Sequence, residues 1–336
     1  MAPSASHRGS AKPLIAGLVY FQLAAGMILF GSATPVSKLV TDAMPVFIGS
    51  TFRVAVGALA LAPLLLVYRG EIAKLGRRDW LLTALIALFG MFGFTVFMLA
   101  GMSLVTGVTG AVVMSTTPAV TAAVAILLIG ESANWRKLAA IALAVGGVLL
   151  LYLGGGTAGG GGTDGSGSSG GGPVVDFLRD LGAGPLAGGL LVFAAVCCEV
   201  AYTLLGQRVS RDVNPLVVAF LAAALAIPLF LPLAAWEWPR FDAAAVATGG
   251  WIAALWYGAG TLALGTWCWY SGIAKTEGSI AAAFMGLMPA SALVLSYLLL
   301  GERFQWIHLA GFGIVFAGVL LMSWEHARMA REDQKP

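Results

Sequence analysis

The fold is decided by two stretches of equal length, PAVTAAVAILLIGESANWRKLAAIALAVGGVLL at residues 118–150 and PASALVLSYLLLGERFQWIHLAGFGIVFAGVLL at residues 289–321. At a spacing of 171 residues, and without a gap, they share a proline, a Gly-Glu pair, a tryptophan and the ending Gly-Val-Leu-Leu. Chance similarity between apolar segments does not keep such residues in one register. The sequence therefore predicts an internal duplication.

The duplication extends towards the N-terminal side of both stretches. Glycines and a methionine keep the same spacing, and nearer the start of each half the spacing becomes 170, which requires one single-residue gap. The matched pairs are Gly101 with Gly272, Gly107 with Gly278, Met114 with Met285, Lys38 with Arg208, Asp42 with Asp212 and Pro45 with Pro215.

The composition indicates a protein that lies in lipid. Hydrophobic residues make up 59% of the 336 residues and charged residues 10%, and the mean hydropathy is +0.89, whereas a soluble domain carries about 25% charged residues. The net charge of +3 gives no reason to expect nucleic-acid binding. Three cysteines, Cys197, Cys198 and Cys268, fall in apolar runs and show no disulfide or metal-binding spacing.

We predict an all-α membrane protein with ten transmembrane helices in two inverted five-helix repeats. Apolar runs of about 20 residues cross a bilayer as helices. An odd number of spans makes the second repeat enter the membrane from the other side, as in many secondary transporters. The expected spans are 14–38, 46–68, 80–100, 106–129, 136–154, 185–207, 214–236, 248–272, 279–300 and 305–324.

The distribution of Lys and Arg predicts the orientation. With a cytoplasmic N-terminus, fourteen of these residues fall on the cytoplasmic side, Arg53 lies inside a span, and the other side receives Lys38, Arg179, Arg240 and Arg303. The positive-inside rule therefore favours both termini in the cytoplasm. We expect a multi-pass protein of the cell (inner) membrane. The first apolar run has full spanning length and no cleavage site, so we expect it to be the first helix.

These boundaries divide the chain into five parts. They are an N-terminal cytoplasmic tail (1–13), the first repeat (14–154), a glycine-rich external linker (155–184), the second repeat (185–324) and a cytoplasmic tail (325–336). The stretch from residue 154 to residue 172 is almost entirely Gly, Ser, Thr and Ala, so it is expected to be flexible. It lacks the Lys-Ser/Thr ending of a phosphate-binding loop.

The chain resembles the EamA family of the drug/metabolite transporter superfamily. A proline-containing helix, a Gly-Glu pair at its end and a final helix with Gly-Val-Leu-Leu occur twice, and the start contains Phe30-Gly31-Ser32, Pro35 and Arg53. The resemblance implies ten helices, inverted repeats, a central cavity and export of amino acids or other small metabolites. The long glycine linker is not typical of the family. The Gly-Glu pairs, Gly130-Glu131 and Gly301-Glu302, are expected to be helix caps.

Two charged residues, Arg53 and Glu199, lie inside the expected spans. A charge at mid-membrane costs at least about 2.5–3.5 kcal/mol, so such residues face a cavity or a partner. Neither follows the repeat, because Arg53 corresponds to Ala223 and Glu199 to Leu29. Arg53 is expected to meet a carboxylate, to pair with Glu199 or, alternatively, to fix helix packing through backbone carbonyls. Glu199 is expected to exchange protons or, alternatively, to stay protonated and hydrogen-bonded to a neighbouring helix.

Further candidates lie near Glu199 or at interrupted helices. Tyr202 and Thr203 follow Glu199 by three and four residues and share its helical face. Pro118 and Pro289 are expected to interrupt matching helices, since a proline inside a helix removes a backbone hydrogen bond. The remaining candidates for the substrate or proton pathway are Thr95 and Thr266, which match in the repeat, with Thr117, Phe30 and Tyr270.

The leading hypothesis is a secondary transporter that exports small metabolites such as amino acids and is coupled to protons through Glu199. The alternative is a cationic drug/proton antiporter. An enzyme is not expected, because one acid and no histidine lie deep in the spans. We expect no cofactor, metal or nucleic acid; the expected partners are a small-molecule substrate and the lipid bilayer, with the chain a monomer or a homodimer.

Overall fold

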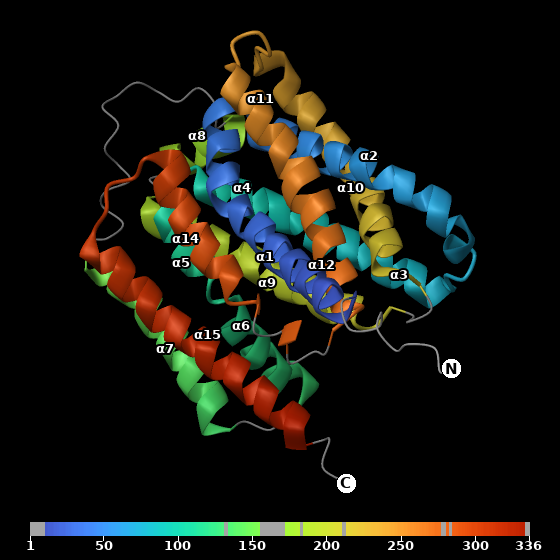
Figure 1. Cartoon of the computed structure of the whole chain (residues 1–336). Coiled ribbons are helices and arrows are strands. Elements are labelled where there is room, and N and C mark those ends of the chain that lie inside the picture. The colour runs from blue at the N-terminus through green and yellow to red at the C-terminus, as the bar shows by residue number, and fades with distance from the viewer. Residues whose placement is uncertain are drawn as a thin grey trace, which may run out of the picture.

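A computed structural model describes residues 11–130, 134–154, 172–181, 184–209, 213–276, 280–281 and 284–332 of the chain. These residues form a bundle of helices and contain no β-strand (Figure 1). Many large apolar side chains remain exposed on the outside, among them Leu59, Leu66 and Leu127. Such a surface is expected for a protein whose solvent is lipid.

The first repeat follows the apolar runs of the sequence. Its third helix continues through a π-helical segment, and its fourth is broken by a turn. The elements are α1 (Ala11–Ala43), α2 (Val46–Ile72), α3 (Arg77–Ile86), η1 (Ala87–Gly93), α4 (Phe94–Met102), α5 (Gly107–Met114), α6 (Thr117–Val124), η2 (Ala125–Ile129) and α7 (Trp135–Leu153).

The second repeat shows a similar succession, again with a π-helical segment in its third helix. A short helix, α8 (Gly172–Asp180), precedes it. The elements of the repeat are α9 (Pro185–Gly206), α10 (Pro215–Glu237), η4 (Trp238–Arg240), α11 (Thr248–Leu255), η5 (Trp256–Leu264), α12 (Gly265–Ile273), α14 (Leu287–Leu300) and α15 (Trp306–Glu332).

Seven helices of the described residues are long and apolar enough to cross a membrane, which confirms a multi-pass helical membrane protein. The eighth predicted span is helical as α11, η5 and α12, and the ninth and tenth contain shorter apolar helices, Leu287–Leu300 and Trp306–Met322. The count of ten therefore stays a prediction. The seven helices coincide with the first seven predicted spans and are Gly17–Ala43, Val46–Tyr68, Arg77–Met102, Gly107–Leu127, Trp135–Leu153, Pro185–Gly206 and Pro215–Arg240.

The predicted linker, residues 155–184, contains a helix that its glycine content did not predict. Residues 155–171 lie outside the described residues, but α8 follows them, and its Val175 is fully buried against the core. Helix also extends into both predicted tails, since α1 begins at Ala11 and α15 ends at Glu332. The flexibility and external position expected for the glycine-rich stretch stay predictions.

The last helices of the two repeats, α7 and α15, lie side by side and run antiparallel (Figure 1). Gly147 of α7 faces Gly311 and Val315, whereas Gly154, further along α7, faces Ile307 near the start of α15. A Cβ atom at Gly147 would lie 2.6 Å from the carbonyl oxygen of Gly311, so the absence of a side chain permits this approach. Corresponding helices thus pack in opposite directions.

The second helices of the repeats, α2 and α10, are also antiparallel, and each caps the other. Near the end of α2, Glu71 Oε2 accepts a hydrogen bond of 2.5 Å from the N–H of Asn214, just before α10. At the end of α10, Glu237 Oε2 accepts from the N–H groups of Phe47 and Ile48 at 2.8 and 3.1 Å. The first N–H groups of a helix have no partner within it, so these carboxylates satisfy donors that local structure leaves open.

Irregular turns occupy similar positions in the two repeats. The π-helical segments η1 and η5 both lie in the middle of the third helix, and such turns are frequent at functional sites because they re-aim side chains. Gly130 and Gly301 end the fourth helices with φ of +78° and +63°. The predicted glycine caps are thereby confirmed, while Glu131 lies outside the described residues.

The helix interruptions expected near Pro118 and Pro289 are present, but their geometry differs from the expected kink. Turns at Ser115–Thr116 and Met285–Gly286 separate helical segments, and the prolines lie in the first turns of α6 and α14. A proline in the first turn of a helix loses no hydrogen bond, because that N–H has no partner in the helix. The prolines therefore start helices and do not bend them.

Candidate functional site

The candidate site is built around Arg53 on α2. Its side chain is 7% exposed, and its Nη1 donates to Thr95 Oγ1 at 2.5 Å. Its guanidinium carbon lies 4.3 Å from the ring centre of Tyr257 and 5.2 Å from that of Phe94. Phe94 and Thr95 begin α4, directly after η1, and Tyr257 lies in η5, so these partners come from the third helices of both repeats. The contacts with the rings offset part of the cost of burying the charge.

Glu199 on α9 contacts the other repeat. It is half-buried, and Thr117 Oγ1, at the start of α6, lies 3.0 Å from its Oε2. The same hydroxyl oxygen lies 2.7 Å from the carbonyl oxygen of Met114. Thr117 thus links the carboxyl group of the second repeat to the broken helix of the first.

Two half-buried tyrosines continue the polar region of α9. Tyr202 follows Glu199 by one turn, packs against Gly90 of η1 and forms a hydrogen bond with Tyr270 of α12. Tyr202 and Glu199 also interact electrostatically. The structure therefore brings four of the predicted site residues together, namely Glu199, Thr117, Tyr202 and Tyr270.

Three other predicted site residues make different contacts. Thr266 is buried in α12. Phe30 on α1 packs against Gly265 of α12, which is a contact between helices. Thr203 is exposed, and its hydroxyl donates to the backbone carbonyl of Glu199 at 3.0 Å, within its own helix. The contact of Phe30 therefore joins α1 to α12, whereas that of Thr203 stays within α9.

Arg53 and Glu199 interact electrostatically but form no direct ion pair. Their charged atoms lie more than 4.0 Å apart in this described part of the chain. Arg53 therefore has a hydroxyl group and two aromatic rings as its contacts, and Glu199 has the hydroxyl group of Thr117.

Tyr257 is the contact of Arg53 that the sequence did not single out. Its side chain is fully buried, whereas the neighbouring Trp256 is 44% exposed. Both are aromatic residues in one apolar run, so their types alone do not tell which faces the interior. The sequence offered only an indirect indication that such a residue exists, because an arginine buried in a membrane requires partners.

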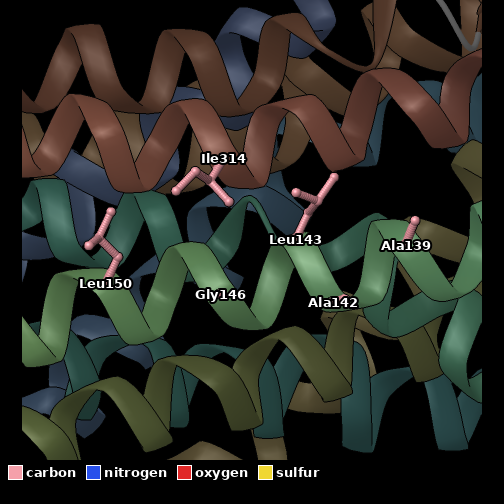
Figure 2. A pocket seen from close by; sticks show the side chains of 6 residues that line it. All are labelled: Ala139, Ala142, Leu143, Gly146, Leu150 and Ile314. Carbon is pink, nitrogen blue, oxygen red and sulfur yellow. The ribbon is translucent and has the colours of Figure 1, made fainter.

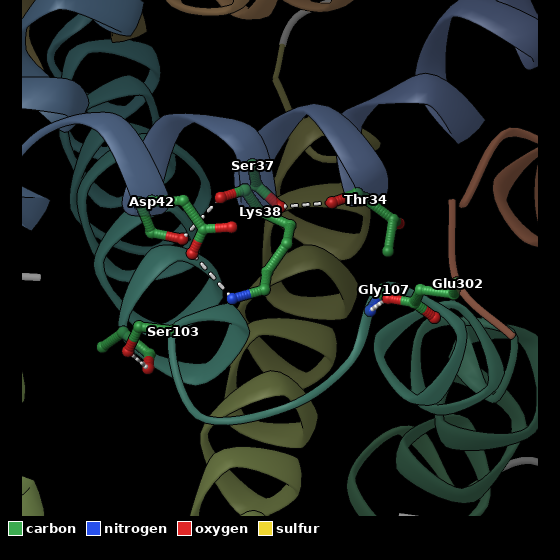
Figure 3. A network of polar contacts seen from close by, with 9 residues as sticks. Thr34, Ser37, Lys38, Asp42, Ser103, Gly107 and Glu302 are labelled. Carbon is green, nitrogen blue, oxygen red and sulfur yellow. Dashed lines mark hydrogen bonds and ion pairs between the residues drawn. The ribbon is translucent and has the colours of Figure 1, made fainter. Parts of the chain in front are cut away.

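A second contact between the repeats lies at helix ends (Figure 3). Both carboxylate oxygens of Glu302, which follows α14, accept from the first N–H groups of α5: Oε1 from Gly107, and Oε2 from Val108 at 2.9 Å. The same view shows the ion pair of Lys38 with Asp42, 2.7 Å long, at the end of α1. Glu302 thus does more than the sequence predicted for a Gly-Glu pair, since it caps a helix of the other repeat.

Two hollows lie on the outside of the bundle and include none of the predicted site residues. One, of about 520 Å³, lies along α7 and α15 (Figure 2), and the other lies along α11 and η5. The central cavity implied by the family resemblance stays a prediction. Among the described residues, no group of His, Cys, Asp and Glu is placed to hold a metal ion. The hollow in Figure 2 is lined by Ala139, Ala142, Leu143, Gly146, Leu150 and Ile314.

Comparison with known families matches the EamA-like transporter family twice, at residues 17–153 and 186–324. The chain is 28% identical over 302 residues to the uncharacterized transporter YetK of Bacillus subtilis (strain 168), with 90% of this chain and 86% of the relative covered. It is 26% identical over 292 residues to the uncharacterized transporter YdeK of the same organism, with 84% and 88% covered. A solved crystal structure, 17% identical in sequence, has a similar fold, with a TM-score of 0.58 over 96% of this chain and 99% of the other.

Proposed function

The chain belongs to the EamA-like transporter family, and from this premise we propose that it is a secondary transporter that exports small metabolites, such as amino acids, in exchange for protons. The relatives are described as transporters, and the described helices are suited to a membrane. The charge distribution supports a location in the cell membrane with both termini in the cytoplasm.

Two inverted five-helix repeats are the architecture that we propose for this transporter. The antiparallel packing of α2 with α10, and of α7 with α15, supports it. In such proteins the solute site lies near the midplane, between the repeats. The surroundings of Arg53 fit this location because Thr95 belongs to the first repeat and Tyr257 to the second. Glu199 and Thr117 likewise come from different repeats.

Proton exchange rests on the contacts of Thr117. Its hydroxyl group has one proton but lies within hydrogen-bond distance of two oxygens, on Glu199 and on the backbone of Met114. With Glu199 protonated, Glu199 donates to Thr117, and Thr117 donates to Met114. With Glu199 charged, two acceptors compete for the single proton. The proton on Glu199 therefore changes how α9 is held to the broken helix, which is the kind of difference that coupling requires.

The test is transport by the purified protein in proteoliposomes, with Glu199→Gln compared with the parent. The amide side chain still donates to Thr117 and keeps the shape of the protonated acid. The variant is expected to exchange solute downhill and to lose accumulation driven by a pH gradient. Asp42→Asn, a change in an exposed acid, serves as the control. If Glu199→Gln accumulates solute as well as the parent, Glu199 is a structural residue.

A cationic drug/proton antiporter is the second candidate. The observation in its favour is Glu199 beside Tyr202, since carboxylates and aromatic rings both attract organic cations. The buried charge of Arg53 opposes it, because like charges repel strongly away from water. Competition between amino acids and organic cations in the same vesicles distinguishes the two functions.

A further inference from the structure

Two buried donors beside each other have no hydrogen-bond partner among the residues that the structure describes. They are Arg53 Nε and the hydroxyl group of Tyr257, on side chains that are 7% and 0% exposed. An unsatisfied buried polar group costs about 1–3 kcal/mol, and roughly 90% or more of such groups are paired in proteins. Helix packing does not explain why two such groups lie together at the buried guanidinium group of Arg53.

Among the described residues, the guanidinium group also has no anionic side chain within 4.0 Å. Thr95 offers a neutral hydroxyl oxygen, and Glu199, the acid that acts on Arg53 electrostatically, has Thr117 as its hydrogen-bond partner. The ring of Tyr257 covers one side of the guanidinium group. The N–H groups point outwards in the guanidinium plane, so an acceptor has to approach them in that plane and not through the face that Tyr257 covers.

The repeat argues against a purely structural arginine. The corresponding residue of the second repeat is Ala223, which is fully buried in α10. The scaffold therefore forms this helix contact with a methyl group as well as with a guanidinium group. A charge that is costly in the membrane and dispensable for packing points to a ligand.

We propose that Arg53 and Tyr257 form an anion subsite that binds the carboxylate group of the transported solute. A guanidinium group matches a planar carboxylate through paired N–H···O bonds, and the hydroxyl group of Tyr257 donates a further one. The inference rests on the proposed transport function and narrows the solute to molecules with a free carboxylate. An amide of the same shape offers one neutral carbonyl oxygen in place of two charged carboxylate oxygens, and a protonated amine offers no acceptor.

The experiment measures binding to the full-length protein in lipid nanodiscs, by thermal stability at rising ligand concentration. The probes are two matched pairs, L-leucine with L-leucinamide and isocaproate with isocaproamide, which differ only in the carboxylate. Losing a hydrogen bond to a charged group weakens binding about 10- to 100-fold. We therefore expect each acid to bind at least about tenfold more tightly than its amide. Equal binding of acid and amide, or binding of neither acid, overturns the proposal.

Two variants assign the effect to these residues. Tyr257→Phe removes a hydroxyl group that has no hydrogen-bond partner in the described part of the chain, so the unliganded protein is expected to be as stable as the parent or more so. Its affinity for both acids is expected to fall about tenfold, and its affinity for the amides, which offer a neutral acceptor, is expected to fall less. Arg53→Lys keeps the charge but not the planar fork and is expected to reduce the preference for acids.

The outcomes separate this proposal from the proposed transport function. Unchanged affinity for the acids in both variants refutes the subsite at Arg53 and Tyr257. Transport in proteoliposomes that persists alongside that result leaves the exporter intact and places solute recognition elsewhere. A Tyr257→Phe protein that is less stable without ligand shows that the hydroxyl group has a structural role, which also contradicts the proposal.

Discussion

Glu237 gives a direct test of how the two repeats are held together. Its side chain is fully buried at the end of α10, and its Oε2 accepts from the N–H groups of Phe47 and Ile48 at 2.8 and 3.1 Å. In Glu237→Ala, both donors remain at the buried start of α2 without an acceptor. We expect this single change to lower the free energy of unfolding clearly.

The magnitude follows from the two bonds. A hydrogen bond to a charged group contributes about 1.5–3 kcal/mol, so the two contribute about 3–6 kcal/mol. Glu237 Oε1 has no hydrogen-bond partner among the described residues, so removing the carboxylate also removes a cost of burying charge, and the net loss is smaller than that sum. The expected net loss is about 2–4 kcal/mol. Glu237→Gln keeps an acceptor without the charge and is expected to lose about half as much.

The assay is unfolding in mixed micelles with a rising fraction of SDS, followed by circular dichroism. Reaction of a thiol reagent with the buried Cys198 and Cys268 provides a second probe of the same transition. Asp42→Ala is the matched control, since its ion pair with Lys38 is exposed and such pairs contribute at most about 1 kcal/mol. If Glu237→Ala unfolds together with this control, the carboxylate does not hold α2, and the reasoning is refuted.

Three further predictions concern the caps, the coupling and the topology. Gly301→Ala is expected to cost about 1–2 kcal/mol because its φ is +63°. Gly313→Ala, where an added Cβ meets nothing within 4 Å, is expected to be neutral or stabilising; equal effects in the same unfolding assay would contradict the cap. Thr117→Val is expected to reduce pH-driven exchange about tenfold and Thr117→Ser to restore it, whereas an unchanged pH profile would remove Thr117 from the coupling. Single cysteines placed within residues 155–171 and after Glu332 of a cysteine-free variant are expected to react with an impermeant reagent from opposite sides, and same-side labelling would exclude the proposed topology.

Much of the helical framework was predictable because lipid imposes simple rules on a sequence. An apolar run must satisfy its backbone internally, so the first seven predicted spans are helices in the structure. A glycine before a charged residue at the end of an apolar run predicted the caps at Gly130 and Gly301. Helix α8 was not predicted, because its short apolar stretch, which contains Val175, follows a long run of glycines that indicates a flexible segment.

The contacts that build the site were less predictable, since they join distant parts of the chain. Glu237 accepts from Phe47, which lies 190 residues earlier at the start of α2, and nothing near Glu237 in the sequence identifies that donor. Periodicity also fails at η1 and η5, where an extra residue per turn changes which side chains face inwards. Tyr257 lies in such a segment, so a regular helical pattern does not place it beside Arg53.

In the proposed exporter the scaffold is repeated, but the charged residues of the candidate site occur in only one repeat each. If the repeats are inverted, a contact of one repeat that opens on one side of the membrane during transport corresponds to a contact of the other repeat that closes on the opposite side. Contacts present in both repeats, such as the caps at Gly130 and Gly301, then favour neither conformation. A ligand or a proton shifts such a balance only by binding the two conformations with different affinities. Arg53 and Glu199, which have no counterparts, are the groups available for that difference. Substitutions in the shared contacts should therefore change stability, whereas substitutions of these two charges should change what is carried and what drives it.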